Sequence, residues 1–255
     1  MWDCPDFLDL PARTQKPRER GLTHVLDKGL PVDDLEGLLE QTGHLVDVLK
    51  VGWGIAYIDR TAKRRVAVCD AAGVTMCLGG TLLEIAAAQG RVPGLARWAA
   101  GLGVHALEVS NGLERLSSEA KTDLVRELSQ DFLVLAETGA KDGHTPVVTE
   151  NWLREMEADL AAGATFVIAE GRESGTVGLY DADGSVREDL VAAIAERVPL
   201  DRVIFEAPRK EQQVWFVEHL GTDVNIGNVP TGEVIALETL RLGLRADTAA
   251  TGNQG

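Results

Sequence analysis

Charged side chains recur where the short apolar runs of this sequence end. The acids at these points are Glu108, Glu137, Glu170 and Glu206, and the bases are Lys28, Lys50, Lys141 and Arg172, with Lys210 as a fifth. One charge after an apolar run is common in any loop, but here the pattern repeats along the chain. If the runs meet at one end of a fold, these side chains converge in a space with little water. There they would hold a metal and an anion, or pair with one another.

The residue types that could ligate a metal favour Mg²⁺ over zinc. No HxH, HExxH or CxxC pattern occurs, so the sequence gives little support to a zinc site. The histidines are scattered, and only His144, close to Lys141, remains a candidate functional residue. Carboxylates suit Mg²⁺, which binds through one or two acids, waters and the oxygens of a substrate. We therefore expect Mg²⁺ as the cofactor.

A stretch near the end of the chain suits a phosphate group. Asn225-Ile226-Gly227-Asn228 lies at the end of the last short apolar run, and a helical pattern begins soon after it near Thr231. In barrels of alternating strands and helices, phosphate sites often lie beyond strands seven and eight at a helix N-terminus. A phosphate-bearing substrate would also account for the spare bases.

The elements that must position these residues alternate between strands and helices. The predicted strands are 22–26, 46–51, 74–78, 104–109, 132–136, 166–169, 203–205 and 224–226. The predicted helices are 32–41, one placed loosely within 55–71, 82–89, 118–128, 149–161, 187–197, 210–219 and 232–242. Eight such units predict a (β/α)₈ TIM barrel of the α/β class, with all strand C-termini on one face. A doubly wound open sheet is the alternative, but it usually has fewer strands, and no glycine fingerprint follows the first strand.

Composition excludes several classes of partner. The chain has 255 residues, 45% hydrophobic and 25% charged, which is enough for one large core or two small ones. Its net charge is −15 and its pI about 4.7, so its field repels nucleic acid and anionic membrane surfaces. No stretch approaches the about 18 consecutive apolar residues that would span a bilayer. An anionic substrate would have to be met by a local cluster of cations.

The ends of the chain and its cysteines bear on location and organisation. Cys4, Cys69 and Cys77 form no CxxC pair, which suits a reducing compartment, and the first residues lack the pattern of a secretory signal. We expect a cytoplasmic protein. Its expected parts are an N-terminal arm over residues 1–20, one barrel domain over 21–247 and a flexible tail over 248–255.

Several stretches, in one order from about residue 18 to 248, resemble those of a single enzyme family. They are Gly21-Leu22-Thr23 with Asp27-Lys28-Gly29, Lys50-Val51-Gly52-Trp53-Gly54, Gly79-Gly80-Thr81-Leu82 with Glu84, Glu170-Gly171-Arg172-Glu173-Ser174-Gly175, Phe205-Glu206-Ala207-Pro208 with Gln212-Gln213, and Leu237-Glu238-Thr239-Leu240-Arg241-Leu242-Gly243-Leu244-Arg245. The family that they resemble is phosphosulfolactate synthase.

The resemblance implies a fold, a reaction and a cofactor. It implies a (β/α)₈ barrel that uses Mg²⁺ to add sulfite to C3 of phosphoenolpyruvate, giving (2R)-3-phosphosulfolactate. The metal would stabilise an enediolate as a Lewis acid, and a lysine would protonate the carbon that bears the phosphate. The family's lysine after the fifth strand matches Lys141. Glu137 would hold that lysine or take part in metal binding. The family also implies a homo-oligomer, such as a trimer.

The site residues expected from the residues and the resemblance fall into three groups. The catalytic group is Lys141, Glu137 and Arg172, the substrate-binding group is Lys28, Lys50, Ser110, Lys210, Asn225 and Asn228, and the metal group is Glu108, Glu170 and Glu206.

Two departures from the family pattern leave alternatives open. Members of the family carry an aspartate where this chain has Asn111, and two adjacent lysines where it has Ala140 and Lys141. Loss of a cation beside the path of sulfite leaves room for the same barrel to add a different nucleophile to phosphoenolpyruvate. A further alternative is a non-catalytic relative of the plant heat-stress-associated proteins, which the family resemblance also covers. Retention of the lysines and of Arg172 argues against it.

Overall fold

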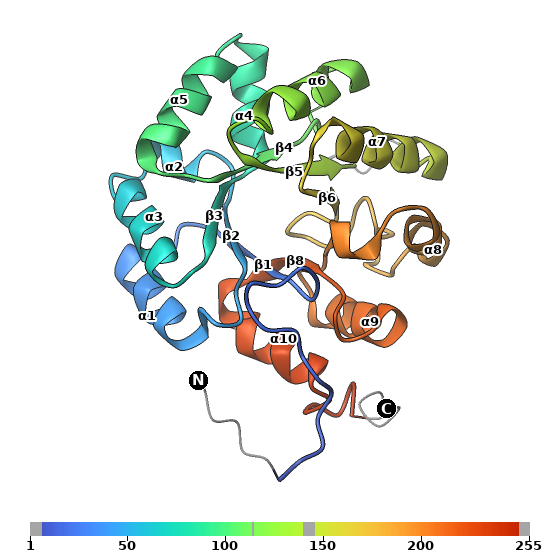
Figure 1. Ribbon diagram of the computed structural model, residues 1–255. Coiled ribbons are helices and arrows are strands. Elements are labelled where there is room, and N and C mark those ends of the chain that lie inside the picture. The colour runs from blue at the N-terminus through green and yellow to red at the C-terminus, as the bar shows by residue number, and fades with distance from the viewer. Residues whose placement is uncertain (1–6, 114, 140–145, 250–255) are drawn as a thin grey trace.

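A closed barrel of parallel strands forms the centre of the computed structural model, which describes residues 7–113, 115–139 and 146–249 (Figure 1). Each strand pairs with the next along the chain, and β1 closes the barrel against β8. The strands are β1 Thr23–Asp27, β2 Val48–Val51, β3 Thr75–Leu78, β4 Ala106–Val109, β5 Leu133–Thr138, β6 Phe166–Ala169, β7 Val203–Glu206 and β8 Ile226–Pro230. Closure confirms the (β/α)₈ prediction and excludes the open doubly wound sheet.

Helices surround the barrel and cover its outer surface (Figure 1). They are α1 Val32–Thr42, α2 Ile55–Ile58, α3 Ala62–Ala71, α4 Gly80–Ala88, α5 Val92–Leu102, α6 Ser118–Leu128, α7 Thr149–Ala162, α8 Glu188–Arg197, α9 Lys210–Leu220 and α10 Val234–Arg241, with short 3₁₀ turns η1 Leu200–Arg202 and η2 Thr231–Glu233. The large core lies between strands and helices, because the outward-facing side chains of the strands are apolar and pack against the helices. None of the helices in the described residues is long and apolar enough to cross a membrane.

The interior of the barrel has an apolar layer below a charged layer. The apolar layer consists of Val48, Cys77, Ala106, Leu135, Ile168, Ile204 and Phe166. Because side chains two residues apart on a strand share a face, the next interior positions on β2, β4, β5 and β7 are Lys50, Glu108, Glu137 and Glu206, and Glu170 takes the corresponding position directly after β6. The apolar layer therefore closes the barrel from below and leaves the charged layer facing the C-terminal ends of the strands.

The segment before β1 packs against the opposite end of the barrel. Arg13 pairs with Asp223 and, at 3.0 Å, with Glu238, while Arg18 pairs with Asp47 at 3.1 Å. Lys16 donates to the carbonyl of Val46 at 2.6 Å. These contacts tie the described part of the arm to the N-terminal ends of the strands, away from the charged layer.

Three differences from the expected elements have local causes. Residues 55–71 form two helices where one was predicted, because the chain turns at Asp59, whose carboxylate accepts the Thr61 N–H at 2.7 Å. α5 was not predicted: Pro93 and Gly94 weaken its start, but the helix tolerates a proline in its first turn. β8 begins at Ile226, two residues later than expected, so Asn225 precedes the strand.

Candidate active site

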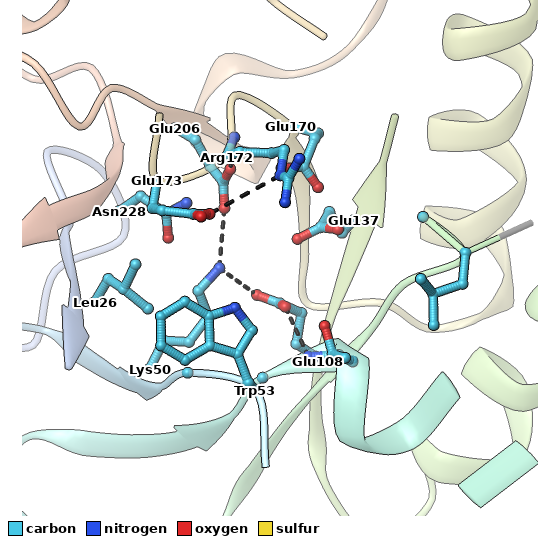
Figure 2. A pocket seen from close by; sticks show the side chains of 16 residues that line it. Leu26, Lys50, Trp53, Glu108, Glu137, Glu170, Arg172, Glu173, Glu206 and Asn228 are labelled. Atoms are coloured by element: carbon cyan, nitrogen blue, oxygen red, sulfur yellow. Dashed lines mark hydrogen bonds and ion pairs between the residues drawn. The ribbon is translucent and has the colours of Figure 1, made fainter. Parts of the chain in front are cut away.

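A cavity of about 470 Å³ opens at the C-terminal ends of the strands (Figure 2). Five glutamates and two bases line its described part: Glu108, Glu137, Glu170, Glu173, Glu206, Lys50 and Arg172. Trp53, Leu26 and Asn228 also line it. The charged layer of the barrel is therefore the floor of a pocket large enough for a small ligand.

Lys50 is the centre of an ion network on that floor. Its ammonium lies 2.9 Å from Glu108 Oε2 and 2.9 Å from Glu206 Oε1, and Figure 2 shows it between the two carboxylates. Burial alone would lower the pKa of Lys50, but the charges of Glu108, Glu206 and Glu137 outweigh it and raise the pKa well above its ordinary value. Lys50 is thus a permanent cation at neutral pH and a poor proton donor.

The second oxygens of the same two carboxylates are held by backbone amides. The Gly80 N–H, at the start of α4, donates to Glu108 Oε1 at 2.8 Å. The N–H groups of Gly171 and Arg172 both donate to Glu206 Oε2 at 2.9 Å. Burial would raise the pKa of Glu108, but the Lys50 charge and the Gly80 N–H outweigh it and lower the pKa. Glu108 therefore stays ionised, with its position fixed from two sides.

A glycine at position 80 is required by close packing. A Cβ atom there would lie 2.2 Å from Ser110 Oγ and 3.2 Å from Glu108 Oε1. Ser110 in turn donates to Glu84 Oε1 at 2.5 Å, so it has no room to move. The absence of a side chain lets the α4 N-terminus approach the Glu108 carboxylate.

Three of the glutamates fit a metal ion. Glu108, Glu137 and Glu206 each offer an oxygen, and these oxygens lie within 4.8 Å of one another. The donors are hard carboxylate oxygens, with no described histidine or cysteine among them, which suits Mg²⁺ better than zinc. The trio differs from the expected metal group, because Glu137 takes the place of Glu170. Glu170 also lines the cavity.

The outer side of β5 is held by a buried lysine. Lys121, on α6, donates to the backbone carbonyl of Glu137 at 2.7 Å and pairs with Asp159 on α7 at 2.7 Å. The β4–β5 ladder ends at Val109 and Ala136, so Glu137 lies beyond its last pair. Lys121 supplies the donor that the ladder no longer provides, and thereby fixes the backbone that carries the Glu137 carboxylate.

Backbone strain is concentrated at the cavity. Trp53, Arg172 and Asn228 are the non-glycine residues with positive φ in the described chain, at 51°, 57° and 53°, and all three line the cavity. This conformation costs free energy and persists only where the surroundings enforce it, commonly at functional sites. For Arg172, the N–H bond to Glu206 is one such constraint.

Of the twelve expected site residues, seven line the cavity, four lie elsewhere and one is outside the described chain. The seven that line the cavity are Lys50, Glu108, Glu137, Glu170, Arg172, Glu206 and Asn228. Lys141, and the histidine candidate His144, lie outside the described residues. The other four expected residues lie away from the lining and are Lys28, Ser110, Lys210 and Asn225.

Each of these four has a different setting. Lys28 is exposed, because Asp27 accepts the N–H groups of Gly29 and Leu30, both at 2.8 Å, and turns the chain outward. Lys210 pairs with Asp247 at 2.9 Å. Ser110 is buried beside Glu84, as described above.

Asn225 lies at the opposite end of the barrel from the cavity. Its side chain accepts the Leu22 N–H at 2.9 Å and donates to the Val203 carbonyl at 3.0 Å. These bonds join β1, β7 and β8 below the apolar layer, so the side chain serves the fold.

Several residues at the site were not among those expected. Trp53, Gly80 and Glu173 line the cavity, and His24 lies buried below it on β1. Trp53, Gly80 and Glu173 fall within the motifs quoted above, so the motifs carried a signal for them. His24 had none, because a lone histidine in an apolar strand usually belongs to the core.

Asn111, one of the two departures, stabilises its own loop. Its Oδ1 accepts the Leu116 N–H at 2.9 Å, and its Nδ2 donates to the Leu116 carbonyl at 2.8 Å. It does not belong to the described lining of the cavity. Ala140, the other departure, lies outside the described residues.

Comparison with known sequences gives matches along nearly the whole chain. The family model described as (2R)-phospho-3-sulfolactate synthase (ComA) matches residues 11–247. A phosphosulfolactate synthase of Methanothermobacter thermautotrophicus is 43% identical over 249 residues, 95% of this chain and 96% of that protein. One from Bacillus subtilis is 37% identical over 247 residues, 95% and 98% of the two chains.

Comparison with solved structures finds the same fold at low identity. A 3-hexulose-6-phosphate synthase superposes with a TM-score of 0.54 at 16% identity, covering 91% of this chain and 96% of the other. The carboxyl transferase domain of Rhizobium etli pyruvate carboxylase gives 0.61 at 11% identity, over 85% of this chain and 41% of the other. Likeness at this identity extends to the barrel and carries no information on the reaction.

Proposed function

Because the chain belongs to the (2R)-phospho-3-sulfolactate synthase family, we propose that it adds sulfite to C3 of phosphoenolpyruvate and produces (2R)-3-phosphosulfolactate. The observation that carries this proposal is the match over residues 11–247, which includes all the residues of the charged cavity. In the reaction, the sulfur of sulfite forms a bond to the methylene carbon. The displaced electron pair moves onto the substrate carboxylate, and C2 then takes up a proton.

The charges of the cavity support a divalent cation as a cofactor. Its described lining holds five glutamates against Lys50 and Arg172, so its charge has the same sign as both substrates. An anion would enter such a pocket only with additional positive charge. Glu108, Glu137 and Glu206 would hold Mg²⁺, which would neutralise the substrate carboxylate as negative charge develops on it.

The residues of the chain have separate proposed roles. Arg172 reaches into the cavity and would bind an anionic group of the substrate, since a guanidinium binds phosphate and carboxylate in a planar fork (Figure 2). Asn228 would contact the substrate through its amide. Both side chains start from a strained backbone, which fixes their direction before the substrate arrives.

Lys141 is proposed as the acid that protonates C2. It matches the family's lysine after the fifth strand, and it follows Gly139, the last described residue of that segment, by two positions. Gly139 has φ +138°, and a Cβ atom there would lie 2.5 Å from Glu170 Cβ, so Gly139 itself lies in close contact with the cavity wall. Lys50 is unsuited to this role because its pKa is raised by the surrounding carboxylates.

The proposal is tested by incubating the purified protein with phosphoenolpyruvate, sulfite and Mg²⁺ and following phosphorus by NMR, with mass spectrometry of the product. Phosphosulfolactate should form in the complete mixture, and none should form without sulfite or with excess chelator. Consumption of phosphoenolpyruvate with another nucleophile alone would favour the altered-nucleophile enzyme. Binding without any turnover would favour a non-catalytic relative. A homo-oligomeric state, such as a trimer, and a cytoplasmic location stay predictions, the first of them open to sedimentation analysis.

A further inference from the structure

The oxygens that a metal would need at this site are already in contact with an ammonium group. Glu108 Oε2 and Glu206 Oε1 each lie 2.9 Å from Lys50 Nζ. They belong to two of the three carboxylates that form the candidate metal site. Lys50 therefore holds the same pair of side chains that would ligate a divalent cation.

The other oxygen of each carboxylate is poorly placed to bind a metal in place of the oxygen that Lys50 contacts. Glu108 Oε1 accepts the Gly80 N–H, and Glu206 Oε2 accepts two N–H groups, those of Gly171 and Arg172. Turning either carboxylate to offer these oxygens would leave buried amides without acceptors, which is costly. A metal at this site would thus be bound through the oxygens that Lys50 contacts.

The ammonium and a metal would compete for these oxygens, because both are cations. Mg²⁺ binds carboxylate oxygens at about 2.0–2.1 Å, so a cation held by the oxygens that Lys50 contacts would lie close to the Lys50 nitrogen and would repel its charge. Below Lys50, the barrel is filled by Val48 and His24, both buried. Lys50 lines the cavity, and its flexible four-carbon stem can move only in that direction.

We propose that a divalent cation displaces the Lys50 ammonium from Glu108 and Glu206, and that the displaced ammonium then binds the anionic substrate. Lys50 is the counter-ion of the carboxylates before the metal binds and a substrate ligand afterwards. Metal and phosphoenolpyruvate consequently bind cooperatively, because the metal releases a cation that the substrate uses. This exchange rests on the metal site of the proposed function, and it is independent of which nucleophile reacts.

Calorimetric titration of Mg²⁺ and Mn²⁺ without substrate tests the exchange in the wild type, Lys50→Met and Glu137→Gln. Lys50→Met removes the competing charge and keeps the length of the side chain, so its metal affinity should rise by roughly tenfold, within the usual range of coupling between sites. Glu137→Gln is the matched control: it removes a metal ligand and leaves the Lys50 contacts in place, so its metal affinity should fall. Phosphoenolpyruvate should tighten metal binding in the wild type and much less in Lys50→Met.

Unchanged or weaker metal binding by Lys50→Met overturns the exchange. This result would leave the proposed reaction standing, because turnover is measured in a separate assay. If Lys50→Met does not fold, the wild type gives the answer through nitrogen NMR of its lysine ammonium groups. Saturating Mg²⁺ should shift the signal of the buried Lys50 ammonium toward that of a mobile one, and an unmoved signal also overturns the exchange.

Discussion

The Nδ1 atom of His24 accepts the backbone N–H of Asn228 at 3.3 Å, so an imidazole on β1 supports β8 directly below the cavity. This bond needs an unprotonated Nδ1. Burial, and to a smaller extent the charge of Lys50, lower the pKa of His24 to about 3, although Glu108 acts in the opposite direction. The strained conformation of Asn228, at φ 53°, therefore rests on a neutral histidine.

The pH dependence of stability should report this histidine. Below pH 6.5 the unfolded chain takes up a proton at His24, and the folded chain does not until about pH 3. The free energy of unfolding should therefore fall on acidification across this window, by up to about 1.4 kcal/mol per pH unit from this group. Urea unfolding at several pH values should show a shallower fall for His24→Gln, with His44→Gln at an exposed position as control. Parallel curves for the wild type and His24→Gln would contradict the prediction.

Substitution of Gly80 should damage both stability and activity. In Gly80→Ala the added Cβ would meet Ser110 Oγ at 2.2 Å, which forces the α4 N-terminus away from Glu108. We expect a loss of about 1–3 kcal/mol in the free energy of unfolding, together with a lower kcat. Gly37→Ala is the matched control, since nothing lies within 4 Å of a Cβ at this exposed helical position. It should raise stability by about 0.5–1 kcal/mol and leave kcat unchanged. Equal effects of the two variants on kcat would contradict the prediction that close packing of the α4 N-terminus on Glu108 matters for turnover.

Removal of Lys141 should separate binding from proton transfer. Lys141→Ala should lower kcat by about 10²–10⁴-fold, the usual contribution of a general acid. Binding of metal and of phosphoenolpyruvate, followed by calorimetry, should change much less. Lys63→Ala, at an exposed position of α3, provides the control. A Lys141→Ala enzyme with normal turnover would assign the proton to another group.

The departure at Asn111 should affect its loop more than the reaction. Asn111→Asp keeps the acceptor for the Leu116 N–H but loses the donor to the Leu116 carbonyl. The cost should be about 1 kcal/mol in unfolding free energy, and larger for Asn111→Ala, which loses both bonds. Turnover with sulfite should be unchanged in Asn111→Asp. A clear gain in turnover would show that position 111 does influence the nucleophile.

Much of the site was predictable because parallel strands in a barrel end on one face. Ala106 and Glu108, or Ile204 and Glu206, are interior neighbours on one strand, so an acid at the end of each apolar run had to reach the same space. This reasoning, with the resemblance, brought together four carboxylates and Lys50, all of which line the cavity. It required only the order of the strands and the alternation of side chains.

The remaining features depend on contacts that no spacing encodes. Lys28 is turned outward by the hydrogen bonds of Asp27. Asn225 was expected near the C-terminal end of the last strand because that strand was predicted over 224–226, whereas β8 runs from Ile226 to Pro230 and Asn225 precedes it. The pairing of Lys50 with two carboxylates follows from side-chain positions across the barrel. Strand boundaries and rotamers of this kind are decided by tertiary packing.

Closure of the barrel between β1 and β8 has a consequence for the synthesis of the chain. Leu22, just before β1, donates its N–H to Asn225 and accepts a hydrogen bond from Arg241, and these residues follow it by 203 and 219 positions. While the ribosome makes the intervening chain, the edge of β1 has no neighbour, and such an edge can pair with another nascent chain. Polar residues of the arm, among them Arg13 and Arg18, precede this edge and find their own carboxylate partners in the completed barrel. The growing chain therefore carries a charged segment next to β1, whose second edge stays unpaired until β8 has been made.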